Sequence, residues 1–82
     1  MIKKCTTRIV RKALRALNLP VFDNLSEEEF KKLKLIDDLR LDSLDLTELI
    51  FCLETDNELL FPQKGLDQCQ TVGDLMKIAE PN

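Results

Sequence analysis

The sequence predicts an all-α fold, a small bundle of three main helices with one or two short additional helices. Three stretches place apolar residues at the i, i+3, i+4, i+7 spacing of an amphipathic helix. No stretch shows sustained alternation of apolar and polar residues, which is the pattern of a half-buried strand. The chain has 82 residues and 44% of them are hydrophobic, so we expect one globular domain over residues 1–82.

The first helix is expected over residues 4–17. Its apolar stripe consists of Val10, Ala13, Leu14 and Leu17. Asn18 is a typical helix stop, and Pro20 prevents the helix from continuing. Residues 1–20 carry no acid and six basic residues, most of which we expect to be exposed: Lys3, Lys4, Arg8, Arg11, Lys12 and Arg15. These residues form either a solvated face or a second docking surface for an acidic partner or an anionic membrane.

A second, short helix is expected over residues 27–34. Ser26 and Glu29 have the spacing of a capping box, in which each side chain accepts a hydrogen bond from the amide of the other residue. The preceding residues 19–24 contain a proline and no apolar periodicity, so we expect a loop there.

The third helix is expected to begin at or beside Ser43 and to end near Asn57, after a connecting segment over residues 35–42. The apolar anchors of that segment are Leu35, Ile36, Leu39 and Leu41. The core face of the helix consists of Leu46, Leu49, Ile50 and Leu53. Leu44 and Phe51 lie on roughly the opposite face, among acidic residues. Two large apolar side chains on one outward face indicate a surface that binds a partner.

The last helix is expected to begin after Thr71, which caps it together with Asp74. Its apolar stripe consists of Val72, Leu75, Met76 and Ala79. Pro81 is expected to end it. Before this helix, a loop over residues 59–62 leads to one helical turn at residues 66–69.

The composition excludes several kinds of catalytic and metal site. The chain has no histidine, which excludes Ser-His and Cys-His catalytic pairs and histidine-containing zinc sites. A calcium loop beginning at Asp38 fails, because Arg40 and Leu49 would occupy positions that require oxygen ligands. We therefore expect a carrier, binding or scaffolding protein that is not an enzyme and holds no metal.

The cysteines and the apolar runs indicate the cellular compartment of the protein. The three cysteines, Cys5, Cys52 and Cys69, show no CxxC spacing and favour a reducing compartment. Basic residues interrupt the apolar stretch of a possible signal peptide, and no apolar run is long enough to span a bilayer. We expect a soluble, cytoplasmic monomer without a membrane partner. Nucleic acid is not expected as a partner, because no aromatic residue interleaves with the basic ones.

Residues 37–61 carry eight acids and one base, Arg40, which gives them a net charge of −7. Within this acidic stretch, the segment DLRLDSLDLTEL over residues 38–49 resembles the modification site of acyl carrier proteins. The likeness continues through Pro62 to the segment TVGDL over residues 71–75, and it covers about residues 35–79. In this family, a serine before an acidic helix receives 4′-phosphopantetheine from coenzyme A.

The resemblance implies a carrier that holds acyl intermediates as thioesters on a phosphopantetheine arm attached to Ser43. A phosphopantetheinyl transferase would attach the arm. The other implied partners are acyl-transferring and ketoacyl synthase-type enzymes with basic patches, in fatty acid, polyketide or related lipid biosynthesis. The residues expected to bind these partners are Asp42, Leu44, Asp45, Glu48, Phe51 and Glu54.

The sequence also departs from the family pattern, and one alternative function stays open. Arg40 stands where the family usually has glycine, Asn57 stands where it often has phenylalanine, and the first helix is unusually basic. These departures favour a specialised carrier. The alternative is a helical interaction module that carries nothing, with the acidic helix 43–57 as its docking surface and Ser43 only as a helix cap.

Overall fold

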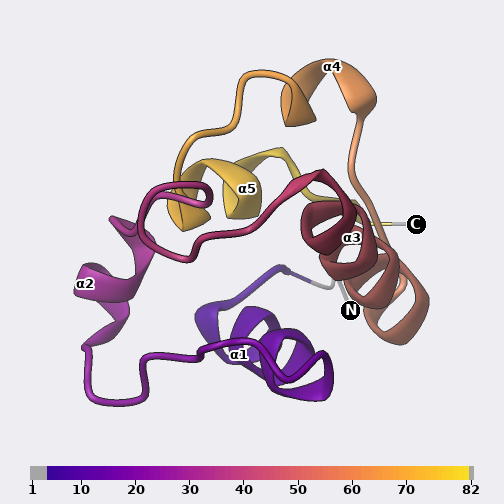
Figure 1. The fold of residues 1–82 in the computed structure, drawn as a ribbon. Helices are drawn as coiled ribbons and strands as arrows, with labels where there is room; N and C mark the ends of the chain where they lie inside the picture. Colours follow the sequence, from indigo (N-terminus) through magenta and orange to yellow (C-terminus); the bar gives the residue numbers. More distant parts are fainter. Residues whose placement is uncertain (1–3, 82) are drawn as a thin grey trace.

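Figure 1 shows the computed structural model, which describes residues 4–81 as a bundle of α-helices. Within these residues the order of elements is α1 (Thr7–Ala16), α2 (Glu27–Lys31), α3 (Ser43–Asn57), β1 (Leu59–Leu60), α4 (Gln63–Leu66), α5 (Val72–Ile78) and β2 (Glu80–Pro81). The predicted all-α bundle is confirmed: α1, α3 and α5 are its main helices, and α2 and α4 are short.

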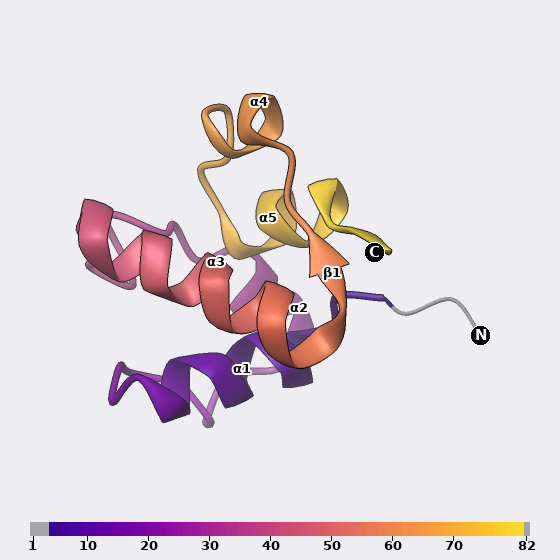
Figure 2. The same cartoon turned by 90° about the vertical axis from the view of Figure 1, so that its right-hand side faces the viewer.

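The helices pack around α3 and α5. Helix α1 contacts α3, whereas α2 and α4 each contact α5. In both views α1 and α4 lie at opposite ends of the molecule, with α5 between them (Figures 1 and 2). This arrangement leaves one side of the long helix α3 uncovered along its length.

Helix α1 is shorter at its start than the predicted range of residues 4–17. It begins at Thr7 because Thr6 caps it: the Thr6 hydroxyl accepts a hydrogen bond from the amide of Ile9 at 3.3 Å. At its other end Leu17 is the C-cap, and Asn18 takes a left-handed backbone with φ of 60°. The predicted stop at Asn18 is therefore confirmed.

Helix α2 has the predicted capping box but ends at Lys31 instead of near Lys34. The reason is a long-range contact with the start of α5. The carbonyl of Leu33 accepts a hydrogen bond from the amide of Val72 at 3.0 Å, and the amide of Leu35 donates to the carbonyl of Gln70 at 2.8 Å. These backbone groups are therefore not available to extend the helix.

The connecting segment over residues 35–42 is anchored by three of its four predicted residues. Leu35, Leu39 and Leu41 are 1–2% exposed, but Ile36 is 58% exposed, so its prediction as an anchor was wrong. The amide of Leu39 donates to the carbonyl of Lys34 at 3.0 Å, which closes a tight turn. This turn directs Leu35 and Leu39 inward and leaves Ile36 at the surface.

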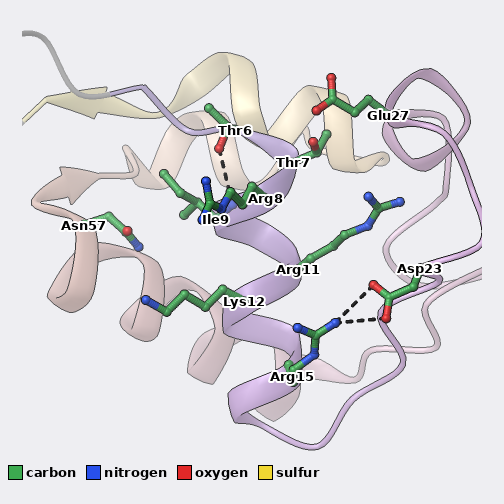
Figure 3. A pocket seen from close by; sticks show the side chains of 10 residues that line it. All are labelled: Thr6, Thr7, Arg8, Ile9, Arg11, Lys12, Arg15, Asp23, Glu27 and Asn57. Atoms are coloured by element: carbon green, nitrogen blue, oxygen red, sulfur yellow. Dashed lines mark hydrogen bonds and ion pairs between the residues drawn. The ribbon is translucent and has the colours of Figure 1, made fainter.

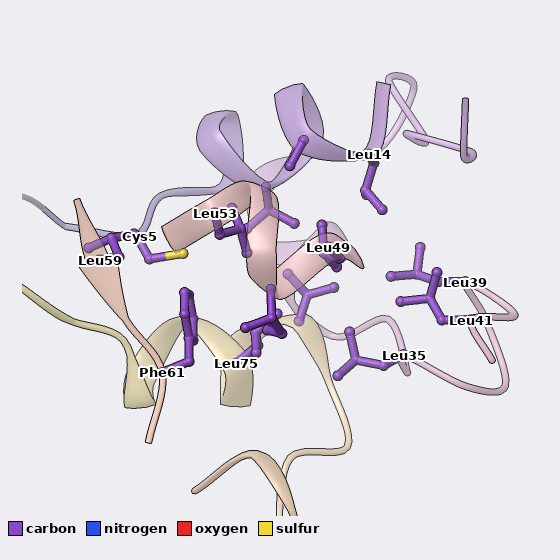
Figure 4. Packing of buried hydrophobic residues seen from close by; sticks show 14 of the residues in the cluster. Cys5, Leu14, Leu35, Leu39, Leu41, Leu49, Leu53, Leu59, Phe61 and Leu75 are labelled. Atoms are coloured by element: carbon purple, nitrogen blue, oxygen red, sulfur yellow. The ribbon is translucent and has the colours of Figure 1, made fainter. Parts of the chain in front are cut away.

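The core lies between α1, α3 and α5, and Figure 4 shows its packing. Leu49 and Leu53 of α3 are fully buried and Ile50 is 8% exposed, as predicted, whereas Leu46 is only half-buried. One end of the core is closed by Cys5, Leu59 and Phe61, and the other by Leu35, Leu39 and Leu41 (Figure 4). The connecting segment and β1 thus cover the two ends of the hydrophobic core.

The C-terminal third differs from prediction in three details. Helix α4 begins directly after Pro62, earlier than the turn expected at residues 66–69. Helix α5 is capped by Thr71 and Asp74 as predicted, but it ends at Ile78 and not at Pro81. The residues beyond Ala79 instead form β2, which pairs with β1 in an antiparallel ladder that the sequence did not predict.

The three cysteines are free thiols. Cys5 is buried, and this burial raises its pKa to about 11. The Cys69 thiol donates a hydrogen bond to the carbonyl of Gly65 at 3.2 Å. Partial burial, with a smaller contribution from the nearby Asp74 carboxylate, raises the Cys69 pKa as well. All three cysteines touch the hydrophobic core, consistent with a role in packing.

Candidate functional site

The first turn of α3 is held by Asp42 and not by Ser43. The Asp42 carboxylate accepts a hydrogen bond from the amide of Asp45 at 2.7 Å, and the Asp45 carboxylate accepts one from the amide of Asp42 at 3.3 Å. This reciprocal pair is a complete capping box with Asp42 as its N-cap. The interpretation of Ser43 as the cap of this helix is therefore wrong.

Ser43 is instead the first residue inside α3, and it is exposed. Within residues 4–81 its hydroxyl has no hydrogen-bond partner. Its backbone carbonyl accepts a hydrogen bond from the Thr47 hydroxyl at 2.9 Å, so the backbone around it is fixed one turn into the helix. The fold presents this hydroxyl to solvent at the end of α3 where helix amides and the helix dipole favour an anion.

The outward face of α3 carries the two exposed apolar side chains that the sequence predicted. Leu44 is 65% exposed and Phe51 is 67% exposed, and Glu48 between them is exposed as well. Ile36, at 58% exposure, is a further surface apolar residue in the segment before the helix. Sequence reasoning missed it because the apolar run around Leu35 gives no information on which side chain turns outward.

Two of the acidic residues on α3 also have structural contacts. Asp45 is half-buried and completes the capping box with Asp42. Glu54 is half-buried, and its carboxylate accepts a hydrogen bond from the amide of Phe61 at 3.1 Å. The Asp-x-x-Asp spacing could have identified the first contact. No sequence signal identifies the second, which joins α3 to the segment after β1.

A groove of about 300 Å³ opens beside α3, on the side where α4 lies. Its lining is apolar with a polar edge: Leu46, Thr47, Ile50, Phe51, Glu54, Gln63, Leu66 and Asp67. The groove begins at Leu46 and Thr47, one turn along the helix from Ser43. Leu46 is half-buried because it packs against the core while also lining this groove.

Arg11 is a basic residue of α1 that contacts the loop before α2, and Figure 3 shows how its side chain lies on the helix. The Arg11 guanidinium donates hydrogen bonds to the carbonyls of Val21, Phe22 and Leu25 at 3.3, 3.2 and 2.8 Å. It also lies over the ring of Phe30, 4.4 Å from the ring centre. Arg11 is therefore a structural residue that holds the loop before α2, and its prediction as part of an exposed face is corrected.

The remaining basic residues of α1 are at the surface. Arg15 is exposed and forms an ion pair with Asp23 at 2.9 Å. Arg8 and Lys12 are exposed and line an open groove of about 940 Å³ along α1 (Figure 3). Lys4 is also exposed, and Lys3 lies outside the described residues.

None of the helices within residues 4–81 has the length and hydrophobicity needed to cross a membrane.

Comparisons with known proteins place the chain in a family. No family model matches the chain, and no solved structure matches it. The chain is 37% identical over 60 residues to an acyl carrier protein of Wolinella succinogenes, covering 72% of this chain and 79% of that protein. It is 32% identical over 71 residues to an acyl carrier protein of Phenylobacterium zucineum, covering 87% and 90% of the two chains.

A third relative, an acyl carrier protein of a Sulfurovum species, is 38% identical over 58 residues, with 70% of this chain and 77% of that protein covered. The three matches agree in name, and each spans most of both chains. Their shared name supports a carrier role for this chain. The helical bundle, the acidic helix α3 and these three relatives together show that the chain belongs to the acyl carrier protein family.

Proposed function

We propose that Ser43 is the attachment site of 4′-phosphopantetheine and that the chain carries acyl groups as thioesters on this arm. The observation that carries the proposal is that Asp42, and not Ser43, caps the start of α3. Asp42 caps the helix, so the exposed Ser43 hydroxyl has no structural task within the described residues. An exposed serine in the first turn of a helix, with a hydroxyl that makes no structural hydrogen bond, is suited to covalent modification.

The surroundings of Ser43 suit a phosphodiester. The new bond would join the Ser43 oxygen to the phosphorus of the pantetheine phosphate of coenzyme A. The pyrophosphate P–O bond would break, adenosine 3′,5′-bisphosphate would leave, and the hydroxyl proton would pass to the transferase that catalyses the step. The chain needs no general base of its own for this chemistry. Because the Asp42 carboxylate occupies only the third amide of the helix, the amides of Ser43 and Leu44 stay available to an anion.

The outward face of α3 supports docking on partner enzymes with basic patches. Leu44 and Phe51 supply apolar contact, and the acidic residues around them supply a field that steers basic surfaces toward Ser43. Partners of this kind are the phosphopantetheinyl transferase and acyl-transferring or ketoacyl synthase-type enzymes of fatty acid, polyketide or related lipid biosynthesis. The docking surface we propose consists of Asp42, Leu44, Asp45, Glu48, Phe51 and Glu54.

The groove between α3 and α4 supports the proposal that the chain carries acyl groups. It begins one turn from Ser43 and is lined by Leu46, Ile50 and Leu66. An acyl chain on a flexible arm would lose water-exposed apolar area by lying along this surface.

Intact-mass analysis after incubation with coenzyme A, magnesium and a broad-specificity phosphopantetheinyl transferase tests the proposal. We expect the wild type to gain the mass of one phosphopantetheine and Ser43→Ala to gain none. The chain offers a matched control, because Ser26 is its only other serine and Ser26→Ala should be modified like the wild type. Modification of Ser43→Ala, or of no variant by several transferases, would leave the docking surface as part of a non-carrier interaction module.

A further inference from the structure

Arg40 combines a left-handed backbone with an exposed cationic side chain in the segment that precedes α3. Its φ is 57°, in the region that favours glycine over residues with a side chain. Leu39 and Leu41 on either side are each 2% exposed, so the backbone of Arg40 is fixed between two buried anchors. The structure therefore requires this conformation at position 40, although arginine adopts it with strain.

The fold makes no use of the Arg40 side chain. Among residues 4–81, three other non-glycine residues have positive φ. Asn18 and Glu58 lie at the ends of α1 and α3, and Phe22 packs against the core. Arg40 is exposed, and within residues 4–81 its guanidinium forms no hydrogen bond or ion pair. A strained residue whose side chain contributes nothing to its own fold is a candidate for a role outside it.

The charge of Arg40 is opposite to that of its surroundings. It is the one base among the eight acids of residues 37–61. It lies three residues before Ser43, a separation that the backbone can span with at most about 11 Å. A partner that brings its active site to Ser43 must therefore approach this cation together with the acidic face of α3.

We propose that Arg40 is a specificity-determining residue of the docking surface. It disfavours partner enzymes whose docking face is basic throughout, and it admits enzymes that place a carboxylate opposite it. The physical reason is like-charge repulsion at a contact that loses water, which discriminates between partners more strongly than it adds affinity. This inference rests on the proposed function, because it assumes that enzymes dock to reach Ser43.

The test compares the rates at which a broad-specificity phosphopantetheinyl transferase with a basic docking face modifies four proteins. Arg40→Asn removes the charge and keeps a residue that tolerates the left-handed conformation. Arg40→Lys keeps the charge. Lys77→Gln removes the same charge from an exposed position on α5, and so controls for net charge.

We expect Arg40→Asn to raise kcat/KM at low salt by about threefold or more, and 0.5 M salt to abolish the gain. Arg40→Lys should keep the wild-type rate, and Lys77→Gln should fall well short of the gain of Arg40→Asn. Binding of each protein to the transferase without coenzyme A should follow the same order. Basic residues of the transferase docking face can also be replaced by glutamate, one at a time. At one position, we expect the replacement to make the wild type a better substrate than Arg40→Asn.

An Arg40→Asn variant modified no faster than the wild type at low salt would overturn the inference. An equal gain for Lys77→Gln would also overturn it, because net charge alone would then explain the effect. Failure of the proposed function is a separate result, since no protein, including the wild type, would be modified. Thermal unfolding of each variant confirms that the comparison is made between folded proteins.

Discussion

Asp42 and Ser43 are adjacent residues that differ in their hydrogen bonding at the start of α3. The Asp42 carboxylate bonds to the Asp45 amide, whereas the Ser43 hydroxyl has no partner within residues 4–81. We expect Asp42→Ala to lower the free energy of unfolding by about 1 kcal/mol, as the loss of a helix cap does. Ser43→Ala should change it by less than about 0.5 kcal/mol.

Urea unfolding of the two variants beside the wild type measures both values. A Ser43→Ala variant that is less stable than Asp42→Ala would show that serine contributes to the cap. The proposed attachment site would then lose the argument that the Ser43 hydroxyl has no structural task.

The sequence could indicate Ser43 but not its exact place in the helix. The Asp-Ser-Leu segment before an amphipathic run predicts the attachment residue that we propose and its acidic surroundings. It left the cap open, because aspartate and serine are about equally good caps and both stand at the helix start. The decision depends on the backbone geometry of residues 41–45, which the buried side chain of Leu41 helps to fix.

At the scale of a single element, α3 divides into a buried and an exposed face. Leu53 is fully buried, so we expect Leu53→Ala to lower the free energy of unfolding by about 2–5 kcal/mol. Glu48 is exposed on the other face, so Glu48→Lys should leave stability within about 0.5 kcal/mol of the wild type. It should nonetheless slow modification by a transferase with a basic docking face.

Chemical denaturation and initial modification rates separate the two effects. The assignment of faces would be wrong if Glu48→Lys unfolded the protein while Leu53→Ala was neutral.

The basic residues of helix α1 likewise differ in role, and Arg11 is the one that stabilises the fold. Arg11→Ala removes hydrogen bonds to three loop carbonyls and the contact with Phe30, so we expect a loss of about 1–3 kcal/mol in stability. Arg8→Ala is the matched control on the same helix and should be close to neutral. Thermal unfolding of both variants checks the difference, and equal stabilities would contradict it.

The corrected role of Arg11 also changes how the basic face must be tested. Neutralising it together with Arg8, Lys12 and Arg15 would loosen the loop before α2 and confuse docking with folding. Helical spacing predicts which residues share a face of α1. It does not predict which arginine reaches carbonyls that lie 10 to 14 residues further along the chain.

At the scale of the whole molecule, acid should weaken the fold through the helix caps. Backbone and side-chain hydrogen bonds from Ser26 lower the pKa of Glu29, and backbone hydrogen bonds from Gln70 and Thr71 lower the pKa of Asp74. A carboxyl group whose pKa is lower in the folded state contributes stability above its unfolded pKa and loses it as the pH falls. We therefore expect the melting temperature to fall below about pH 5.

Melting curves between pH 6 and pH 3 measure this dependence, and Asp74→Asn isolates one part of it. The asparagine can still accept the amide hydrogen bonds but does not titrate, so its curve should be flatter in this range. An unchanged slope would show that the caps do not couple the fold to pH.

Long-range pairing is the part of the fold that the sequence could not predict. The antiparallel contact of β1 with β2 involves two residues on each side, which is too short for an alternating pattern to be recognised. The backbone bridge between Lys34 and Thr71 likewise depends on tertiary packing, and it ends α2 three residues early. Helices, caps and most of the core follow local rules, whereas these contacts depend on how the helices meet.

The burial of Cys5 and the partial burial of Cys69 bear on the stability of an acyl thioester on the proposed arm. An acyl thioester can be lost by exchange with any thiolate that reaches it, and a carrier with cysteines of its own risks self-acylation. With a pKa of about 11, only about one Cys5 side chain in ten thousand is ionised at pH 7. The raised pKa of Cys69 and its hydrogen bond to the Gly65 carbonyl act in the same direction. Packing these sulfurs against the core would therefore suppress their competition with the thiol of the proposed phosphopantetheine arm for the acyl group.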